Sequence, residues 1–369
     1  METRPYVSWE QIGSFMRAAF KACGLPAEDA AICADVLMES DRRGIESHGC
    51  NRFKPIYIDR IRAGILNPVT EIEVLKETPT TMVTDAHDGM GMVASYHMMK
   101  KLIEKAKTYG LAMGAIRNSS HYGIAGYWST MATKEGMIGI TGTNARPSIA
   151  PTFGVENMLG TNPLTIGLPT DEEFPFVIDC ATSITQRGKI EYFARNGKDT
   201  PAGMVIGKNG EALTDSKQIL VDLTEGTAAL APLGGINDDL AGYKGYGYAT
   251  VVEVLSAALQ AGSYMKMLTG FDENGNRRPY HLGHWFLVVD PDAFMGKETF
   301  KRICGEILRG LRASEKAPGR DRIYTAGEKE YLCWLDRKDK GVPVGEGVQK
   351  DLTTVRDWYE LPFKFDFEN

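Results

Sequence analysis

The sequence lacks features that mark several large classes of proteins. No apolar run in its 369 residues approaches the length of a membrane span, and the first residues, METRPYVSWEQ, contain no apolar stretch typical of a signal peptide. The sequence also contains no repeat of fixed period and no low-complexity tract. We therefore expect neither a membrane partner nor a signal peptide.

Cysteine pairs and excess positive charge are also missing. The cysteines show no CxxC or zinc-binding spacing, which predicts reduced thiols, a cytoplasmic protein and no metal site. They are Cys23, Cys33, Cys50, Cys180, Cys304 and Cys333. The net charge of −6 argues against a nucleic-acid partner or an anionic membrane surface. Apolar content of 43% and charged content of 24% are typical of an ordinary globular protein.

The first part of the chain has the pattern of a helical region. Ser8 and Gln11 form a capping-box pattern, after which apolar residues recur at helical spacing until Gly24. Pro26 then opens a second amphipathic helix. A further helix is predicted at 297–311, and we expect the C-terminal third to pack against the N-terminal helices.

Short apolar strands appear from residue 80 onward. They are predicted at 81–84, 111–116, 137–141 and 176–179, with helices at about 93–107 and 124–134 between them. A chain of 369 residues is too long for one ordinary core, which predicts two domains. We expect an α/β (α+β) fold, with a sheet domain at about 80–289 and a helical domain formed by 1–79 and about 290–369.

One polar turn is the first candidate for chemistry. The segment 117–127, RNSSHYGIAGY, follows an apolar strand and leads through Gly123 and Gly126 into a helix, with His121 at its centre. A histidine on such a turn, beside the backbone donors of residues 118–120, favours a functional role. A solvated turn residue is the alternative.

A second polar segment contains a cation beside a titratable ring. In SDRRGIESHGCNRF, His48 and Arg52 are four residues apart, so a helix starting near His48 would place both on one face. A planar guanidinium matches a carboxylate, and an imidazole can donate to it. This pattern predicts a carboxylate-binding pair, although a solvated helix start would explain it too.

Two motif matches have more ordinary explanations. GMGMVA at 89–94 matches GxGxxA between a strand and a helix, but the next strand ends in Arg117 rather than an acidic residue for a ribose. We therefore predict a tight turn. His281 and His284 have no third ligand nearby in sequence, and we interpret them as structural.

The middle of the chain contains three candidate binding segments. The long loop at 142–170 has the composition of a binding loop. Asp179 ends a strand, where a carboxylate can accept from a sugar hydroxyl or from backbone amides. Glycines between 234 and 247 precede a helix predicted at about 249–261, with Lys244 nearby, which is typical of an anion site.

Several motifs in a fixed order closely resemble the malate/L-lactate dehydrogenase family, which is distinct from the Rossmann-type lactate and malate dehydrogenases. They are RGIESHGCNRF, RNSSHYGIAGY, TNARPSIAP, LGTNPLTIGLP, VIDCATS, PLGG, KGYGYA and AGE, and they span about residues 8–330. The resemblance implies a non-Rossmann sheet domain that binds NAD(P). It also implies a homodimer.

The resemblance assigns roles to individual residues. His121 is similar to the family's general acid/base, and His48 and Arg52 to its substrate-binding histidine and arginine. His48 is the rival proton donor. The implied cofactor contacts are Asp179, Cys180, Ala181, Leu233, Gly234, Ala326, Gly327 and Glu328.

This sequence departs from the family pattern in three places. Ala326 replaces the usual proline, and Cys180 stands where methionine is common. The segment 236–243, INDDLAGY, is inserted between PLGG and KGYG, where it is expected to affect the substrate pocket or the dimer contact.

The function implied by the resemblance is interconversion of a 2-hydroxy acid and a 2-oxo acid with NAD, with NADP left open. Malate and oxaloacetate are favoured, because Arg42, Arg43 and Arg52 would supply a second cation for a dicarboxylate. Another 2-oxo acid or a cyclic imino acid is the alternative. A non-catalytic cofactor-binding dimer is a further one, and the joint presence of His48, Arg52 and His121 argues against it.

Overall fold

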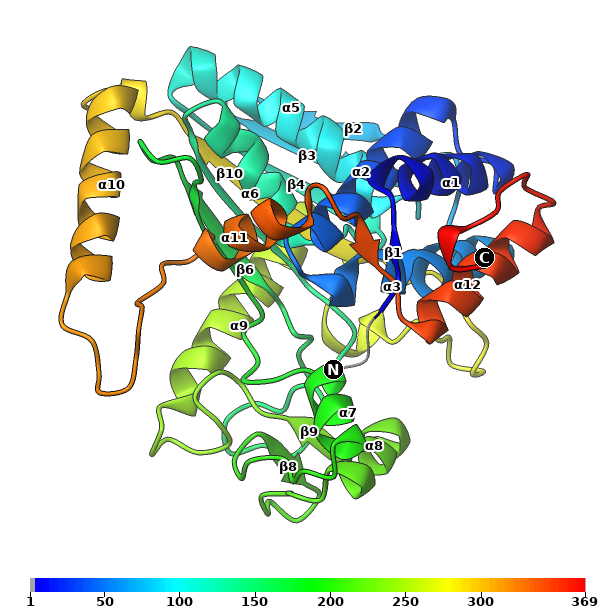
Figure 1. The fold of residues 1–369 in the computed structure, drawn as a ribbon. Coiled ribbons are helices and arrows are strands. Elements are labelled where there is room, and N and C mark those ends of the chain that lie inside the picture. The colour runs from blue at the N-terminus through cyan, green and yellow to red at the C-terminus, as the bar shows by residue number, and fades with distance from the viewer. Residues whose placement is uncertain (1–3, 369) are drawn as a thin grey trace.

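A seven-stranded sheet forms the centre of the molecule, as seen in the computed structural model, which describes residues 4–368 (Figure 1). The strand order is β2-β3-β4-β10-β5-β6-β7, and among these neighbours only β3 and β4 run parallel. The strands are β2 (Glu73–Glu77), β3 (Thr81–Asp85), β4 (Leu111–Ser119), β5 (Ile138–Thr143), β6 (Leu164–Leu168), β7 (Phe176–Cys180) and β10 (Leu282–Val289). This mixed sheet confirms the α/β fold class and differs from the parallel sheet of a Rossmann domain.

Helices cover both faces of this sheet. On one face lie α5 (Gly91–Tyr109) and α6 (Ala125–Lys134), and on the other lies α9 (Gly242–Ala257). Along β10, Phe286 packs into the core on the α5 side, while Gly283 lies directly against the backbone of Ser256 in α9. Alternate residues of the strand thus serve opposite layers.

The N- and C-terminal helices pack against the α5 layer. They are α1 (Trp9–Ala22), α2 (Ala27–Arg42) and α12 (Glu346–Trp358), and β1 (Tyr6–Val7) pairs with β11 (Val342–Pro343). The Ser8 hydroxyl accepts the N–H of Gln11 at 3.2 Å, which confirms the predicted cap. One apolar core runs from Phe15 of α1 and Leu352 of α12 to Phe286 of the sheet.

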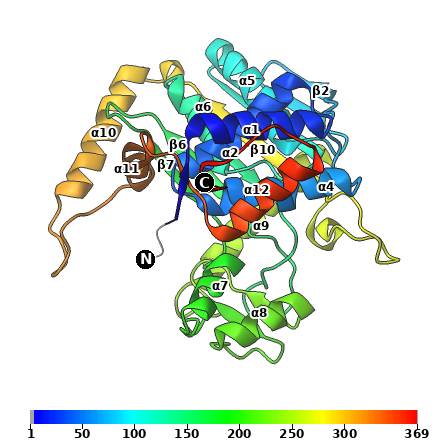
Figure 2. The same ribbon diagram turned by 45° about the vertical axis from the view of Figure 1, so that its right-hand side comes forward.

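A smaller lobe projects from the sheet (Figure 2). It contains α7 (Arg187–Arg195), β8 (Val205–Gly207), α8 (Ser216–Glu225) and β9 (Ala228–Leu230). Its apolar cluster, which includes Ile190 and Ile219, is separate from the main core. The division of the chain into a helical and a sheet domain stays a prediction.

Two helices lie on the side of β6 and β7 in Figure 2, namely α10 (Lys297–Ala313) and α11 (Glu328–Arg337). The remaining helices are η1 (Glu46–His48), α3 (Cys50–Arg52), η2 (Phe53–Ile58), α4 (Asp59–Arg62), η3 (Ala258–Gln260), η4 (Met265–Leu268), η5 (Pro291–Ala293) and η6 (Asp366–Glu368). Within the described residues, no helix is both long and apolar enough to cross a membrane.

Some sequence expectations about these elements were wrong. The glycines at 242, 245 and 247 do not precede a helix but form the first turns of α9, where small residues allow close packing: a Cβ on Gly245 would lie 2.2 Å from the carbonyl oxygen of Leu233. Helix α10 contacts Asp171, between β6 and β7, through Arg309 rather than packing on the N-terminal helices. Strands β1, β2, β6, β8, β9, β10 and β11 were missed.

Candidate active site

An irregular helical segment, residues 46–62, carries several polar side chains of the candidate site. It begins as the 3-10 turn η1, becomes helical at Cys50, and continues from Phe53 to Ile58 as the π-helix η2. Pro55 lies within η2 and cannot donate a backbone N–H, which favours a departure from α-helical bonding. Five residues separate Arg52 from Tyr57, and the wider π-turn brings such positions toward one face.

Gly49 is required by space. A Cβ at this position would lie 2.1 Å from a carboxylate oxygen of Asp41, which is buried and accepts the backbone N–H of Cys50 at 2.9 Å. Burial raises the pKa of Asp41 to about 7, although the hydrogen bonds from Cys50 act in the opposite direction. The glycine thus lets a buried acid hold the turn that carries His48.

The structure brings His48 and His121 together within one chain. Their rings are stacked, with centroids 5.7 Å apart and an interplanar angle of 22°. The Nδ1 atom of His48 lies 2.9 Å from the hydroxyl of Ser47. Burial, with the nearby charge of Arg52, lowers the pKa of His48 to about 4. His48 is therefore neutral near pH 7 and can donate a hydrogen bond without adding charge.

His121 is held by two groups on its Nδ1 atom. The Tyr57 hydroxyl lies 2.6 Å from Nδ1, and the backbone N–H of Gly123 donates to it at 3.3 Å. Because a backbone N–H can only donate, Nδ1 is an acceptor here, and the proton of the neutral ring is on Nε2. Gly123 has a φ of +81°, and a Cβ there would lie 2.3 Å from Val36.

Burial and several nearby side chains disfavour a positive charge on His121. Burial lowers its pKa well below the usual value, and His48, Arg60, Arg52 and His284 lower it further in that order. The imidazole is therefore neutral near pH 7 in the unliganded protein. An incoming anion would offset these positive charges and make protonation easier.

Arg52 is oriented by its own segment. Its Nε donates to the carbonyl of Ser47 at 2.6 Å, and among the described residues its two terminal nitrogens have no hydrogen-bond partner. Arg52 as a whole residue is half-buried. An arginine fixed in this way is suited to bind a carboxylate beside the histidine pair.

The strands beneath His121 are tied together by a buried histidine. His284 lies 2.9 Å from the Ser119 hydroxyl and 2.7 Å from that of Thr143, which agrees with its interpretation as structural. The hydroxyl of Ser120 accepts the N–H of Gly91 at 2.9 Å, and a Cβ on Gly91 would lie 2.1 Å from the Ser120 carbonyl. The GMGMVA motif therefore serves close packing under the turn.

The first candidate cofactor segment lies at the end of β7. Asp179 accepts the N–H of Gly126 at 2.7 Å and the hydroxyl of Thr165 at 3.0 Å. Burial raises its pKa, and these two hydrogen bonds partly oppose the rise. Cys180 is exposed and Ala181 is half-buried. Asp179 thus ties β7 to the start of α6, a few residues after His121.

The second candidate segment adjoins the first. The N–H of Leu233 donates to the carbonyl of Thr182 at 2.8 Å, so the chain after Ala181 and the chain at Gly234 lie side by side. Leu233 is half exposed, and Gly234 has a φ of +102°. Two segments that are distant in sequence therefore form one surface.

The third segment, Ala326 to Glu328, is fastened to the same strand. The N–H of Val177 in β7 donates to the carbonyl of Ala326 at 3.3 Å, and a Cβ on Gly327 would lie 2.6 Å from the carbonyl of Pro175. Glu328 is buried and accepts the N–H of Thr325 at 3.0 Å. This segment therefore depends on close backbone contact with β7.

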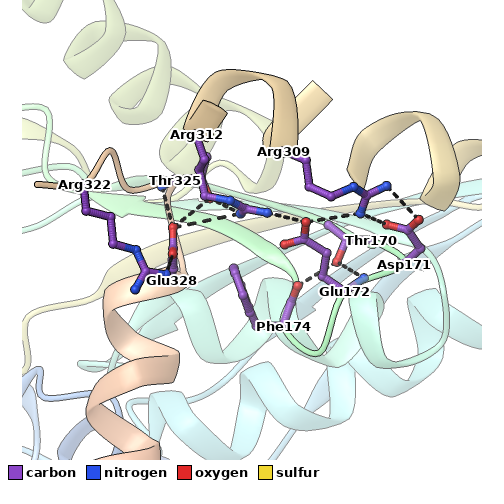
Figure 3. Close-up of polar contacts among 9 residues, drawn as sticks. All are labelled: Thr170, Asp171, Glu172, Phe174, Arg309, Arg312, Arg322, Thr325 and Glu328. Atoms are coloured by element: carbon purple, nitrogen blue, oxygen red, sulfur yellow. Dashed lines mark hydrogen bonds and ion pairs between the residues drawn. The ribbon is translucent and has the colours of Figure 1, made fainter. Parts of the chain in front are cut away.

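A network of ion pairs holds Glu328 in place (Figure 3). Arg322 pairs with Glu328, and Arg312 of α10 pairs with Glu172 and lies 3.9 Å from Glu328. Arg309 binds Asp171 at 2.8 Å. The pKa of Glu328 is lowered because the Thr325 N–H and Arg322 together outweigh the effect of burial. Helix α10 thus supports the Ala326–Glu328 segment.

A wide cleft with a volume of about 550 Å³ lies beside these segments. We define the wide cleft by its lining residues, which include Arg42, Arg43, Asp179, Gly327, Glu330 and Tyr331. Arg42 binds Asp35 and Glu39, each at 3.1 Å, and Arg43 binds Glu39 at 2.9 Å. His48 and His121 do not line this cleft. Arg42 and Arg43 were therefore wrongly expected to supply a second cation to the substrate.

Sequence reasoning missed two side chains near His121, Tyr57 and Arg60, and a third, Arg146, that lines a cavity with Arg60. Tyr57 was missed because it lies in a π-helical segment, where the spacing differs from that of an α-helix, and Arg60 follows it by three residues. Arg146 lies in the loop predicted to bind a ligand and within the TNARPSIAP motif, but no role was assigned to it. Among the described residues, no group of three or more His, Cys, Asp or Glu side chains is arranged to hold a metal ion.

Comparisons with known proteins agree with one another. The family model described as malate/L-lactate dehydrogenase matches residues 7–353. A malate dehydrogenase of Pyrococcus horikoshii is 39% identical over 94% of this chain and 93% of its own length. An L-sulfolactate dehydrogenase of Methanocaldococcus jannaschii is 39% identical over 91% and 92%. The crystal structure of a malate dehydrogenase from Entamoeba histolytica has a TM-score of 0.94 at 40% identity, covering 98% of this chain and 100% of that one.

Proposed function

The chain belongs to the malate/L-lactate dehydrogenase family, and from this premise we propose that it interconverts malate and oxaloacetate with NAD. The observation that supports this most directly is the stacked pair of His48 and His121 beside Arg52. Together these three side chains supply a carboxylate-binding cation, a neutral hydrogen-bond donor and a proton-transfer group at one site. Malate is favoured because similar proteins over most of the chain are malate dehydrogenases.

Arg52 and His48 orient the substrate in this proposal. The terminal nitrogens of Arg52 bind the carboxylate next to the reacting carbon, and neutral His48 donates to the same group. Fixing the carboxylate in this way sets the position of the neighbouring carbonyl relative to His121. The nicotinamide cofactor supplies the hydride in reduction and accepts it in oxidation.

His121 transfers the proton in this proposal. During reduction the doubly protonated ring gives its Nε2 proton to the oxygen that develops negative charge, and it keeps the Nδ1 proton, which the Tyr57 hydroxyl oxygen accepts. During oxidation, neutral His121 takes the hydroxyl proton at Nε2. This requires the tautomer whose proton is on Nδ1, donated to the Tyr57 oxygen, so substrate binding shifts the ring proton from Nε2, where the unliganded protein holds it, to Nδ1. The Tyr57 hydroxyl both donates and accepts, so it can hold the ring in either protonation state.

The residues around the wide cleft fit the dinucleotide that the family implies. The cleft is large enough for one part of such a ligand, it offers the ring of Tyr331 stacked on Phe174 at 5.1 Å, and Glu330 has no ion-pair partner within residues 4–368. A carboxylate suits a ribose hydroxyl and repels a 2′-phosphate, which favours NAD over NADP. Asp179, Cys180, Ala181, Leu233, Gly234 and Ala326 to Glu328 would hold the cofactor.

The proposal includes a homodimer in the cytoplasm. Helix α9 is apolar on its outer face, where Val251 and Val254 are 50% and 51% exposed, whereas its acidic residue Glu253 points inward and accepts from Asn162 at 2.7 Å. Such an arrangement fits a helix covered by a second copy. The six cysteines, all within the described residues, are unpaired, which suits a reducing compartment.

A matrix of substrates and cofactors tests this function. Purified protein is assayed with NADH and NADPH against oxaloacetate, pyruvate, 2-oxoglutarate, sulfopyruvate, diketogulonate and piperideine-2-carboxylate. We expect the highest kcat/KM with NADH and oxaloacetate. Higher activity on another acid would identify that acid as the substrate in place of oxaloacetate. No turnover of any of these acids would favour a non-catalytic dimer.

A second test separates His121 from its rival His48. If His121 transfers the proton, His121→Ala loses most of its kcat while His48→Ala chiefly raises KM. If His48 is the donor, the pattern reverses. The pH dependence of kcat in the two variants then identifies which ring titrates during turnover.

A further inference from the structure

A second cavity, of about 310 Å³, carries an unusual excess of positive charge. We call it the arginine pocket and define it by Arg60, Arg146, Arg277, Asp59 and Tyr280, together with the chain around Pro55 and Gly270. The three arginines come from α4, the long loop after β5, and the turn before β10. Convergence of three cations from distant segments is costly unless something negative offsets them.

The charges of the arginine pocket are not balanced within the described residues. No carboxylate pairs with Arg60, Arg146 or Arg277, and the one acid on the wall, Asp59, is bound by Lys54 at 2.9 Å. Arg60 instead lies over the ring of Tyr280, with 4.4 Å to its centroid. Stacking leaves the edges of a guanidinium free to donate hydrogen bonds.

The arginine pocket adjoins the histidine pair. Arg60 follows Tyr57 by three residues, and the Tyr57 hydroxyl is 2.6 Å from His121. The backbone positions of Tyr57 and Arg60 are therefore about one helical turn, about 5 Å, apart. Arg60 is also near enough to His121 to lower its pKa. The pKa of Arg60 is itself lowered, first by burial and then by the positive charges of Arg146 and Arg52.

We propose that the arginine pocket binds a second anionic group on the substrate, with Arg146 and Arg60 as its ligands. The inference rests on the proposed function, in which Arg52 and His48 bind the first carboxylate. A four-carbon diacid places its two carboxylates on the scale of one helical turn. A carboxylate and a sulfonate share the required chemistry, so the pocket selects 2-oxo and 2-hydroxy acids with either group at the far end.

The test compares substrates that differ only at that end. Oxaloacetate and sulfopyruvate carry the second anion, whereas 2-oxobutanoate carries a methyl group in its place. In the unaltered enzyme, the ratio of kcat/KM for each dianion to that for 2-oxobutanoate should be large. In Arg146→Gln this ratio should fall about 10- to 100-fold, since hydrogen bonds to a charged group are lost. Whichever dianion has the higher ratio identifies the preferred anion.

Two further variants separate charge from structure. Arg146→Lys keeps the charge but not the fork, and should restore part of the ratio. Arg302→Gln removes an exposed arginine that pairs with Glu306 on α10, far from the pocket in sequence, and should leave the ratio unchanged. An unchanged ratio in Arg146→Gln, or an equal loss for all three substrates, would overturn the proposal.

Direct binding keeps the proposal separate from the proposed function. Succinate and butyrate are titrated calorimetrically into the protein without turnover, and succinate should bind more tightly, an advantage that Arg146→Gln removes. If no 2-oxo acid is reduced but this advantage is present, the function fails and the subsite stands. If 2-oxo acids are reduced without preference for the dianions, the subsite fails and the function stands.

Discussion

Arginines line both the wide cleft and the arginine pocket, but in the described part of the chain only those of the wide cleft are paired with carboxylates. In the wide cleft, Arg42 and Arg43 are bound to Asp35 and Glu39. In the arginine pocket, Arg60 and Arg146 have no acidic partner within residues 4–368. An arginine whose charge is already paired stabilises the fold, whereas an unpaired one is available to a ligand. Counting arginines in the sequence cannot distinguish these two states.

The largest expected effect tests whether the reaction takes place at His121, next to the arginine pocket, rather than in the wide cleft. His121→Ala should lower kcat by about 10²- to 10⁴-fold, the usual scale for a lost acid/base group. Steady-state kinetics with NADH and the preferred 2-oxo acid measure the loss. His97→Ala is the matched control, since His97 lies outside both cavities. Turnover near that of the control would remove His121 from the mechanism.

A smaller effect tests whether the wide cleft serves the cofactor. Glu328→Gln removes the charge that Arg322 and Arg312 share, so the Ala326–Glu328 segment should lose its fixed position. We expect KM for NADH to rise about 10-fold with little change in KM for the 2-oxo acid, as expected for a lost charge-assisted hydrogen bond. A rise in both constants, or in the acid alone, would contradict the assignment of the cleft.

The pH profile offers a third contrast between the cavities. Oxidation requires neutral His121, whose pKa is lowered by burial and then by His48 and Arg60, so kcat/KM for the hydroxy acid should be flat above about pH 6.5 and fall only in more acidic solution. Arg60→Met removes one positive neighbour. The pKa should rise and the acid limb should move to higher pH. Arg42→Gln, in the wide cleft, should leave the limb in place.

The smallest effect concerns stability. Arg43→Gln breaks a partly buried pair with Glu39 and a hydrogen bond of 3.1 Å to Thr130. We expect the free energy of unfolding to fall by about 1 kcal/mol, while the ratio of activities on oxaloacetate and 2-oxobutanoate stays unchanged. Urea denaturation and the kinetic ratio are measured on the same preparation. If the activity ratio changed while the free energy of unfolding did not, the roles assigned to the two cavities would be wrong.

Local patterns were sufficient to predict much of the fold. The Ser8 cap, α5, α6 and four strands of the sheet followed from side-chain spacing. Strand β10 was missed because HLGHWFLVV lies far from its partners β4 and β5 in sequence, and its pairing is set by tertiary contact. The first turns of α9 were missed because their glycines resemble a loop.

The candidate site was predictable only in part. His121, His48 and Arg52 belong to recognisable motifs, and the structure brings the two histidine rings together. Tyr57 was not predicted because its contact depends on the π-turn, and Arg146 because it reaches its pocket from a loop without periodicity. A sequence shows which side chains can bind an anion, but not which of them already have a partner.

The π-turn between Phe53 and Ile58 has a consequence for how this chain can change. Removal of a single residue there would restore an ordinary helix and rotate Arg60 about 100° relative to Arg52. Substitutions within the turn leave this register intact. Insertions and deletions, rather than substitutions, are thus the genetic changes to which the geometry between the two anion-binding arginines is most vulnerable.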